Sequence, residues 1–300
     1  MAGLCVTQTI PPKPAVGQAI LIRVFVDPMA GVQGGNPMSL VLDARNMSTA
    51  DMRTLAAHHG YESSFVLPPD DPEQHDLRLR YFVPAHEMEM CGHATVGTLW
   101  ALRQWELWTK PSARIQTLSG DVEVIWDDTN DRVWISQPDV RVEALTDDQR
   151  AVIACVLRID PAMPGLHAIN ACTSRVKTLV RLPDIGMLNA LKPNFGAMGS
   201  LCEAIGSTGL YPYVLHEDEA FARQFPKSSG YLEDAATGIA AAALWGYLNV
   251  NGMISAGSFT VRQGVAMGAP SAIHLHARDD APGCWLSGEV AWQEIYSANG

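Results

Sequence analysis

The sequence predicts an α+β fold of two similar halves, each a layer of strands around a central apolar helix. Two segments carry this prediction, because a helix that is apolar on nearly all sides must be buried on all sides. Residues 94–107 include only two charged residues, Arg103 and Glu106, and residues 235–250 include none. Both segments are too short to cross a membrane, so we expect each to be surrounded by strands of its own half.

A repeated phrase supports the division into halves. Ala94-Thr95-Val96-Gly97 enters the first apolar helix, and Ala236-Thr237-Gly238 enters the second. The two alanines are 142 positions apart (236 − 94), which is close to half of the 300 residues. A diverged internal duplication would explain the repeat and would bring two helix N-termini to one cleft. The expected segments are a loose lead over 1–17, half-domains over 18–138 and 139–284, and a C-terminal strand over 285–300 that returns to the first half.

Local signals place the other elements of the first half. Ser48 is suited to cap a helix that runs to about His58, and Gly60 is suited to end it. Apolar or alternating runs predict strands, and a glycine-rich turn separates the first two. The strands are expected over residues 19–26, 38–42, 65–67, 77–83, 115–118, 121–126 and 132–136, and the turn over 31–37.

The second half is expected to begin after a boundary region over 137–142, which carries Pro138. Thr146 is suited to cap a helix over 147–157, because two aspartates follow it in the first turn. A short helix is expected over 185–191. Further strands are expected near 171–173, 178–181, 209–215, 259–262, 272–276 and 284–295.

The composition limits the classes of partner and compartment. A net charge of −11, with 47% hydrophobic and 18% charged residues, is typical of an ordinary soluble globular protein and disfavours nucleic acid or an anionic membrane as the main partner. Six scattered cysteines, with no CxxC and no His/Cys cluster at metal-ligand spacing, favour the reducing cytosol and predict no metal site. Residues 1–17 lack the basic start and apolar core of a secretory signal. We therefore expect a cytoplasmic protein.

Three groups are candidates for proton transfer: Glu62, the Cys91/His93 pair and Asp234. Glu62 lies between a helix-stopping glycine and an apolar strand, where partial burial would make it a stronger base. The alternative, which its position alone favours, is a carboxylate that accepts hydrogen bonds from nearby backbone N–H groups. Asp234 precedes the second apolar helix, so its alternative role is a helix cap. Its neighbour Glu233 is harder to explain as a cap, and two acids before an apolar helix indicate function.

Cys91 and His93 flank Gly92 at the start of the first apolar helix. The N–H groups of a helix start are unpaired and carry partial positive charge, which favours a thiolate or binds a carboxylate. The alternatives are a small buried hydrophobe for Cys91 and a structural imidazole for His93. We do not expect the two to form a nucleophile–base dyad, because the members of such pairs normally come from distant segments.

Several ordered stretches carry a resemblance that runs from about Arg23 to the C-terminus. They are VFVDPMAGVQGGNPMSLVLDA, GYESSFVLP, LRLRYFVPAHEMEMCGHATVGTLWAL, SGYLEDAATGIAAAAL and VRQGVAMGAPSAIHLHA. In these stretches the chain resembles the PhzF-like phenazine-biosynthesis family, relatives of diaminopimelate epimerase. The resemblance implies two similar domains, each a β-barrel-like sheet around a central helix, with the site in the cleft between them. It also implies proton transfer without a metal or organic cofactor, and a homodimer, since family members tend to form dimers.

The resemblance also implies roles for single residues. The family's general acid/base glutamate, which follows the first helix, corresponds to Glu62. The family's GH pair corresponds to Gly92 and His93, with His93 contacting and assisting the substrate, and its ED-ATG motif places Asp234 in the site. The residues expected to bind the substrate are Cys91, Gly92, Ala94, Thr95, Ala236, Thr237, Gly238 and Ile239.

Departures from the family pattern concern the substrate and the thiol. Ile239 stands where the family usually has a serine, and Ala235 where a proline is common. The lost hydroxyl makes the pocket less polar, so the family's phenazine precursor need not be the substrate. Met90-Cys91-Gly92-His93 is also similar to the first catalytic cysteine motif of proline racemases. The matching place in the second half holds Ala235-Ala236, which disfavours a two-thiol racemase.

We therefore expect an isomerase of a small anionic carboxylate. Glu62 would remove a proton next to a carboxylate or conjugated acid and return it at another carbon, while His93 and Asp234 orient the substrate. One alternative is an amino-acid epimerase or racemase that uses Cys91. Another, suggested by Ile239, is a catalytically idle family member that acts by binding. No nucleic acid, membrane, metal or cofactor is expected as a partner.

Overall fold

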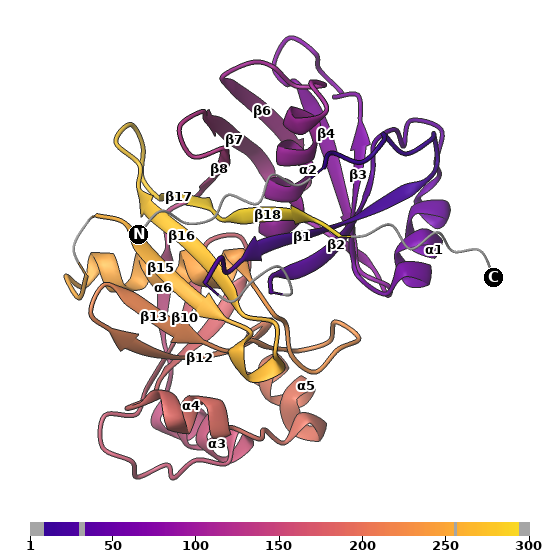
Figure 1. Cartoon of the computed structure of the whole chain (residues 1–300). Helices are drawn as coiled ribbons and strands as arrows, with labels where there is room; N and C mark the ends of the chain where they lie inside the picture. Colours follow the sequence, from indigo (N-terminus) through magenta and orange to yellow (C-terminus); the bar gives the residue numbers. More distant parts are fainter. Residues whose placement is uncertain (1–8, 30–33, 255–256, 294–300) are drawn as a thin grey trace. The chain divides into compact units, whose positions relative to one another are not determined.

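The structure is a computed structural model that describes residues 9–29, 34–254 and 257–293 (Figure 1). The glycine-rich turn expected over 31–37 lies partly outside the described residues. The chain divides into two compact units: the described residues up to 136 and from 287 onward form the first, and residues 137–286 form the second. None of the helices in the described part of the chain is long and apolar enough to cross a membrane.

A continuous series of paired strands forms the sheet of the first unit. Its strands are β1 (Ala19–Val26), β2 (Asn36–Val41), β3 (Glu62–Leu67), β4 (Leu77–Phe82), β5 (Glu87–Met88), β6 (Ser112–Thr117), β7 (Gly120–Asp127), β8 (Arg132–Gln137) and β18 (Glu289–Trp292). β1 pairs antiparallel with both β18 and β2. β3 then runs parallel to β2, β4 antiparallel to β3, and β6 parallel to β4. β7 and β8 complete the series with antiparallel pairings, and β5 pairs beside β4.

The second unit repeats this series. Its strands are β9 (Arg141–Ala144), β10 (His167–Cys172), β11 (Val176–Arg181), β12 (Gly209–His216), β13 (Glu219–Ala222), β14 (Phe225–Pro226), β15 (Phe259–Gln263), β16 (Ser271–Ala277) and β17 (Cys284–Ser287). β10 pairs antiparallel with both β9 and β11. β12 runs parallel to β11, β13 antiparallel to β12, β15 parallel to β13 and β16 antiparallel to β15. The order of parallel and antiparallel pairings is the same in both units, so the predicted fold class is confirmed.

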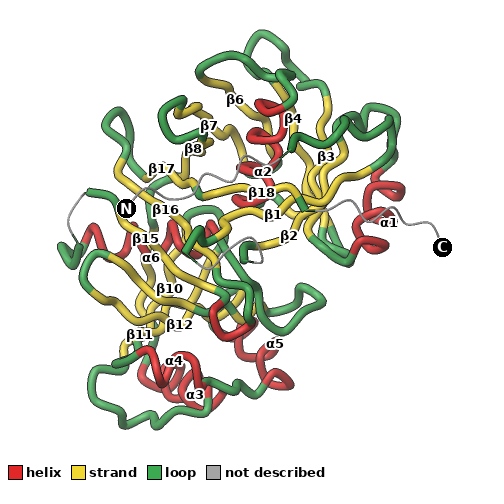
Figure 2. Tube along the Cα trace, in the orientation of Figure 1, coloured by secondary structure: helices red, strands yellow, loops and turns green. Residues whose placement is uncertain are grey.

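Each unit contains one helix with almost no exposed surface. These helices are α2 (Gly92–Gln104) and α6 (Gly238–Val250), and 11 of the 13 residues of each are buried. α2 packs against β1, β2, β3 and β18, and α6 packs against β10, β11 and β16. In the tube view each helix lies among the strands of its own unit (Figure 2). Each sheet therefore wraps around a central apolar helix, as predicted.

Glycine allows both central helices to approach their surroundings closely. A Cβ atom on Gly97 of α2 would lie 2.6 Å from Met38 Sδ and 2.7 Å from Val24 Cγ2. A Cβ atom on Gly246 of α6 would lie 2.7 Å from Val140 Cβ. Real Cβ atoms do not come this close to other heavy atoms, so each glycine marks a contact that a larger residue would force apart.

The remaining helices cover the outside of the sheets. They are α1 (Thr49–His59) in the first unit and α3 (Asp147–Leu157), α4 (Ile185–Ala190) and α5 (Phe195–Ala204) in the second, with a 3₁₀ turn over Val265–Met267. The predicted caps are confirmed: Ser48 and Thr146 each form a capping box, and Gly60 ends α1 in the left-handed region. α1 covers an apolar cluster that includes Met52, Phe65 and Phe82.

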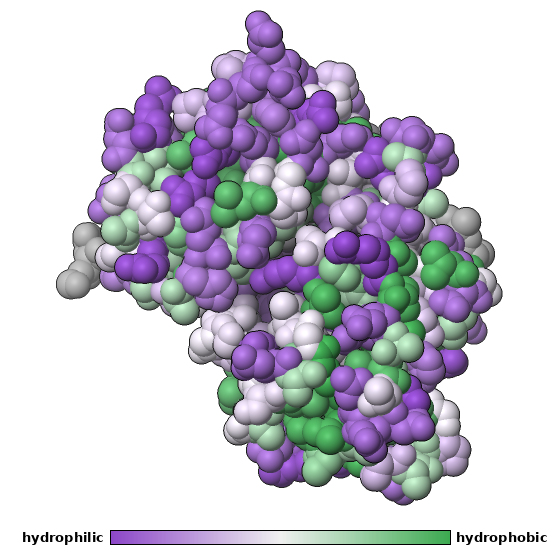
Figure 3. All heavy atoms as spheres, turned by 180° about the vertical axis from the view of Figure 1, so that it is seen from behind, coloured by the Kyte–Doolittle hydropathy of each residue, from purple (hydrophilic) through white to green (hydrophobic). Residues whose placement is uncertain are grey.

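An apolar groove lies between α3 and α5, lined by residues such as Val152, Val156 and Leu201. Hydrophobic side chains gather in the lower part of the space-filling view (Figure 3). In Figure 1 the lower part of the molecule carries α3, α4 and α5.

Several elements differ from the sequence expectation. α5 was not expected, because Gly196 and Gly199 disfavour a helix; its apolar face packs on the core beneath α3, which overrides the propensity. β13 was not expected either, since Glu219–Ala222 is short and rich in helix-forming residues. The single strand expected over 284–295 is divided into β17 and β18.

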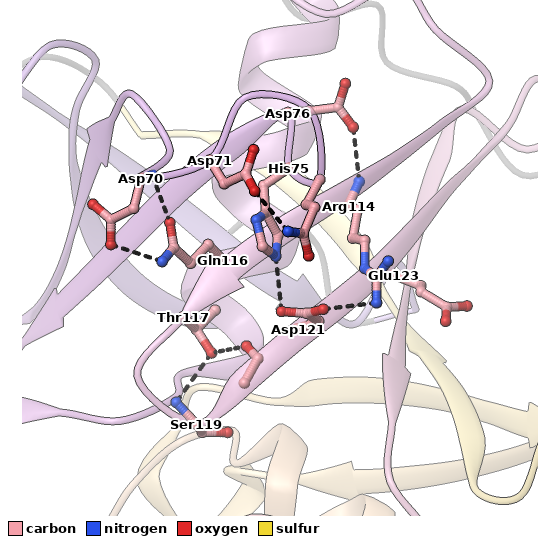
Figure 4. Close-up of polar contacts among 12 residues, drawn as sticks. Asp70, Asp71, His75, Asp76, Arg114, Gln116, Thr117, Ser119, Asp121 and Glu123 are labelled. Atoms are coloured by element: carbon pink, nitrogen blue, oxygen red, sulfur yellow. Dashed lines mark hydrogen bonds and ion pairs between the residues drawn. The ribbon is translucent and has the colours of Figure 1, made fainter.

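Polar side chains join the loop before β4 to β6 and β7 (Figure 4). Asp70 accepts a hydrogen bond from Gln116 Nε2 at 2.8 Å. Asp121 lies 2.9 Å from His75 Nε2 and 2.8 Å from Arg114 Nη2. The hydrogen bond from His75, together with the nearby Arg114 guanidinium, holds the pKa of Asp121 below its usual value. These contacts tie a turn-rich loop to the sheet that it follows.

Replacing Gly97 with alanine tests the packing of α2. We expect Gly97→Ala to lower the free energy of unfolding by about 1–3 kcal/mol, because Val24 is rigid and the site has no space for a methyl group. Gly199→Ala in α5 is the matched control, since its Cβ would meet nothing closer than Lys227 O at 3.9 Å. There the helix propensity of alanine should raise stability by roughly 0.5–1 kcal/mol. Urea unfolding of both variants measures the two changes, and equal signs would contradict the packing argument.

Candidate active site

Strand β3 and the start of α2 bring the predicted residues of the first unit together. Glu62 is the first residue of β3, and Cys91 is the N-cap of α2. Glu62, Cys91 and His93 are 6%, 6% and 4% exposed. Within α2, Gly92, Ala94 and Thr95 are also buried.

His93 lies between a thiol and a carboxylate. Its Nδ1 is 3.4 Å from Cys91 Sγ, and its Nε2 is 4.0 Å from Glu62 Oε2. The side chains of Cys91 and His93 are therefore in contact, and the expectation that they do not act as a nucleophile–base dyad stays a prediction. Cys91 has the extended backbone of an N-cap residue and His93 lies in the first helical turn, so two positions along the chain suffice to bring the side chains together. The imidazole of His93 therefore contacts the thiol at hydrogen-bond distance and faces the carboxylate of Glu62 from beyond that distance.

Hydroxyl groups anchor β3 and the start of α2 behind these three residues. Thr95 Oγ1 donates to Cys91 O at 2.8 Å, and Tyr81 OH lies 2.7 Å from the same oxygen of Thr95. Because the proton of Thr95 is directed to Cys91 O, Tyr81 is the donor in the second contact. Burial raises the pKa of Tyr81, so its hydroxyl keeps that proton. The hydroxyls of Thr98 and Ser64 are hydrogen-bonded at 2.9 Å, which fixes the strand of Glu62 to the helix of His93.

A second group of buried polar residues lies before α6 in the second unit. Gln263 Nε2 donates to Asp234 O at 2.7 Å and to Thr237 Oγ1 at 3.2 Å. Gln263 Oε1 accepts from Thr237 N–H at 3.2 Å and from Tyr211 OH at 2.9 Å. Since Thr237 Oγ1 accepts from Gln263, its own proton is free for Asp234 Oδ2, and the structure has this hydrogen bond. Asp234 thus presents a carboxylate whose position is fixed by its neighbours.

The start of α6 corrects two expectations. Asp234 is not the cap of this helix: the N-cap is Thr237, and α6 begins at Gly238. The helices begin at Gly92 and Gly238, a separation of 146 (238 − 92), whereas the repeated phrase gave 142. The phrase therefore lies inside α2 in the first unit but spans the start of α6 in the second. In the register of the helix starts, Thr237 and not Ala235-Ala236 matches Cys91, and the second unit still offers no thiol there.

Glu233, the acid next to Asp234, is held on the opposite side of the chain. Arg223 Nε and Nη2 donate to the two oxygens of Glu233 at 2.8 and 2.7 Å. Arg223 Nη1 also donates to carbonyl groups at the end of α4, including Leu188 O and Leu191 O at 3.0 Å. The two neighbouring acids therefore have different roles. Glu233 is part of a structural ion pair, and Asp234 is the candidate site residue.

The family profile described as "Phenazine biosynthesis-like protein" matches residues 25–291 of the chain. The chain belongs to the phenazine biosynthesis-like family. It is 29% identical over 267 residues to the "Uncharacterized isomerase YddE" of Salmonella typhimurium, covering 83% of this chain and 87% of the relative. It is 28% identical over 262 residues to the "Trans-2,3-dihydro-3-hydroxyanthranilate isomerase" of Pseudomonas fluorescens, covering 86% and 91%.

The crystal structure of a Bacillus anthracis phenazine biosynthesis protein of the PhzF family matches with a TM-score of 0.77 at 23% identity, covering 91% of this chain and 96% of that one. This likeness concerns the fold. Since the family relatives are named isomerases and match over most of both chains, the chain is an enzyme of the isomerase class.

Sequence reasoning found the residues of each half but missed their supports. Gln263 and Tyr211 lie far from the motif in sequence, and only the fold brings them to Asp234. Among the described residues of this family member, no three histidine, cysteine, aspartate or glutamate side chains are arranged to hold a metal ion.

Removing the guanidinium of Arg223 tests the support behind Asp234. The side chains of Arg223 and Glu233 are 9% and 13% exposed. We expect Arg223→Met to lower the free energy of unfolding by about 3–5 kcal/mol, because Glu233 keeps a buried charge without its partner. The double variant with Glu233→Gln should recover part of this loss. Arg262→Met is the control: its pair with Glu219 is more exposed, so the expected loss is under about 1 kcal/mol. Urea unfolding measures all three, and a loss in Arg223→Met no larger than in the control would contradict the argument.

Proposed function

We propose that the enzyme isomerises a small carboxylic acid by moving a proton from one carbon to another, without a metal or organic cofactor. The observation that carries this proposal is the buried carboxylate of Glu62, 4.0 Å from the imidazole of His93 at the start of α2. A base that removes a proton from carbon needs a site that keeps bulk water away and holds the base in place. Glu62 and His93 are both less than 10% exposed, and hydrogen-bonded hydroxyls hold together the strand and the helix that carry them.

In this proposal Glu62 is first the base and then the acid. His93 and Asp234 orient the substrate and stabilise the charge that develops on it. The N–H groups at the two helix starts, Gly92–Thr95 and Ala236–Gly238, hold carboxylate oxygens, since a helix N-terminus attracts anions. The buried Ile239 adds an apolar side chain to the second of these starts, beside the hydroxyl of Thr237. A relative named for a dihydro-hydroxyanthranilate supports a small cyclic acid as the substrate.

Proton exchange in deuterated water tests the role of Glu62. Candidate acids are incubated with the enzyme, and NMR follows the loss of carbon-bound protons. We expect Glu62→Gln to slow the exchange by about 10²–10⁴-fold, the usual contribution of a general base. Glu73→Gln, on an exposed loop of the same unit, is the control and should exchange at the wild-type rate. Unchanged exchange in Glu62→Gln would exclude Glu62 as the base.

The contact between Cys91 and His93 favours a second candidate, an epimerase in which the thiol is one of two proton carriers. The 3.4 Å separation of Sγ and Nδ1 lets the imidazole take the thiol proton. We expect Cys91→Ser to slow exchange at least tenfold and to change the stereochemical outcome if this candidate is correct. Cys155→Ser, at an exposed position of α3, is the control. Full activity with the same product stereochemistry in Cys91→Ser leaves Glu62 as the proton carrier.

A further inference from the structure

Gln224 has a buried carboxamide to which the chain offers no partner. Its exposed fraction is 0%. Among the described residues, no group lies within hydrogen-bond distance and geometry of its Oε1 or its Nε2. Burying an amide away from water without replacing its hydrogen bonds is costly, and native proteins rarely retain such a group unless a ligand or a water molecule pairs with it. The carboxamide of Gln224 therefore requires an explanation outside the fold.

The backbone places this carboxamide beside Asp234. Gln224 and Asp234 form an antiparallel bridge, in which Asp234 N–H donates to Gln224 O at 3.1 Å. Residues opposite one another in such a bridge project to the same face, and their neighbours project to the other. The pairing of Arg223 with Glu233 fits this alternation. The side chains of Gln224 and Asp234 thus share the face of the sheet that carries Gln263 and Tyr211.

The chain makes room for Gln224 by having no side chain at Gly209. A Cβ atom on Gly209 would lie 2.4 Å from Gln224 Nε2. Gly209 is the first residue of β12, and Glu62 is the first residue of β3. These two strands hold the same place in the repeated series of pairings. In the second unit this strand begins with a glycine, and the carboxamide of Gln224 occupies the space that a side chain on Gly209 would take.

Gln263, on the same face, is a glutamine with a structural role and can be compared with Gln224. Its four hydrogen bonds satisfy both ends of its carboxamide and hold the segment between Asp234 and Thr237. Gln224 makes none of these bonds, so it does not hold the segment. The difference separates a glutamine that supports the site from one whose polar atoms are free for a ligand.

We propose that Gln224 binds the substrate, with Nε2 donating to a substrate oxygen and Oε1 accepting from an amino or hydroxyl group next to it. This rests on the proposed function in one respect, that Asp234 borders the substrate. A carboxamide offers a donor and an acceptor side by side. It therefore selects an acid that carries an amino or hydroxyl group on the carbon next to the one bearing the carboxylate, over the same acid without that group.

Calorimetric titration of the full chain with benzoate and 2-aminobenzoate tests this selection. The two acids differ by one amino group. We expect the wild type to bind 2-aminobenzoate about tenfold more tightly, the effect of one matched hydrogen bond in a buried site. In Gln224→Leu the ratio of the two dissociation constants should fall to about one. Gln104→Leu, which changes a glutamine on the surface of the first unit, should keep the wild-type ratio.

Thermal unfolding of the free protein distinguishes a ligand-binding role from a structural one. Leucine has a similar size and no polar atoms, so Gln224→Leu should keep or raise the melting temperature, whereas loss of a satisfied hydrogen bond would lower it. A clearly lower melting temperature, a preference for 2-aminobenzoate that survives in Gln224→Leu, or a wild type that binds neither acid would overturn the proposal. Binding is measured without turnover, so an absence of proton exchange would contradict the proposed function and leave this result standing.

Discussion

The central helix of each unit has no polar face, and the rest of the structure depends on that constraint. A helix with 11 of 13 residues buried cannot lie on the surface of a sheet; the sheet has to surround it. Side chains inside such a sheet are apolar except where backbone groups need partners. The first N–H groups of a helix have no partner within the helix, so the helix start is the natural place for buried polar chemistry. Glu62, Cys91 and His93 in the first unit, and Asp234 and Thr237 in the second, gather at these starts.

The alternation of side chains along a strand separates chemistry from support. Around the bridge between Gln224 and Asp234, two polar side chains project to the inner face. Their neighbours Arg223 and Glu233 form a buried ion pair on the other side, where Arg223 also binds the carbonyl end of α4. A one-residue shift of this segment would exchange the two pairs. The ion pair therefore fixes the register on which the position of Asp234 depends.

The sequence carried enough information for the fold class and for the residues of each half of the site. The two apolar helices could be predicted because a continuous apolar run has few solutions, and Ser48, Gly60 and Thr146 mark helix ends through local hydrogen bonds. α5 could not be predicted, because its stability comes from packing against residues distant in sequence. The contact between Tyr211 and Gln263 joins two strands that are distant in sequence, so no local sequence pattern could predict it. The repeated Ala-Thr phrase does not align the two halves correctly. The phrases are 142 residues apart, whereas the central helices start 146 residues apart.

Because the two units repeat one topology, their corresponding strands can be compared directly. Six successive pairings agree in order and direction, so equal places in the two sheets can be compared although their residues differ. The fourth strand in this series begins with Glu62 in one unit and with Gly209 in the other. The space that a side chain on Gly209 would take is occupied by the carboxamide of Gln224. Two copies of one fold can thus divide a reaction: on our proposals, the first supplies the group that carries the proton, and the second supplies neutral and anionic groups that recognise the molecule from which it is taken.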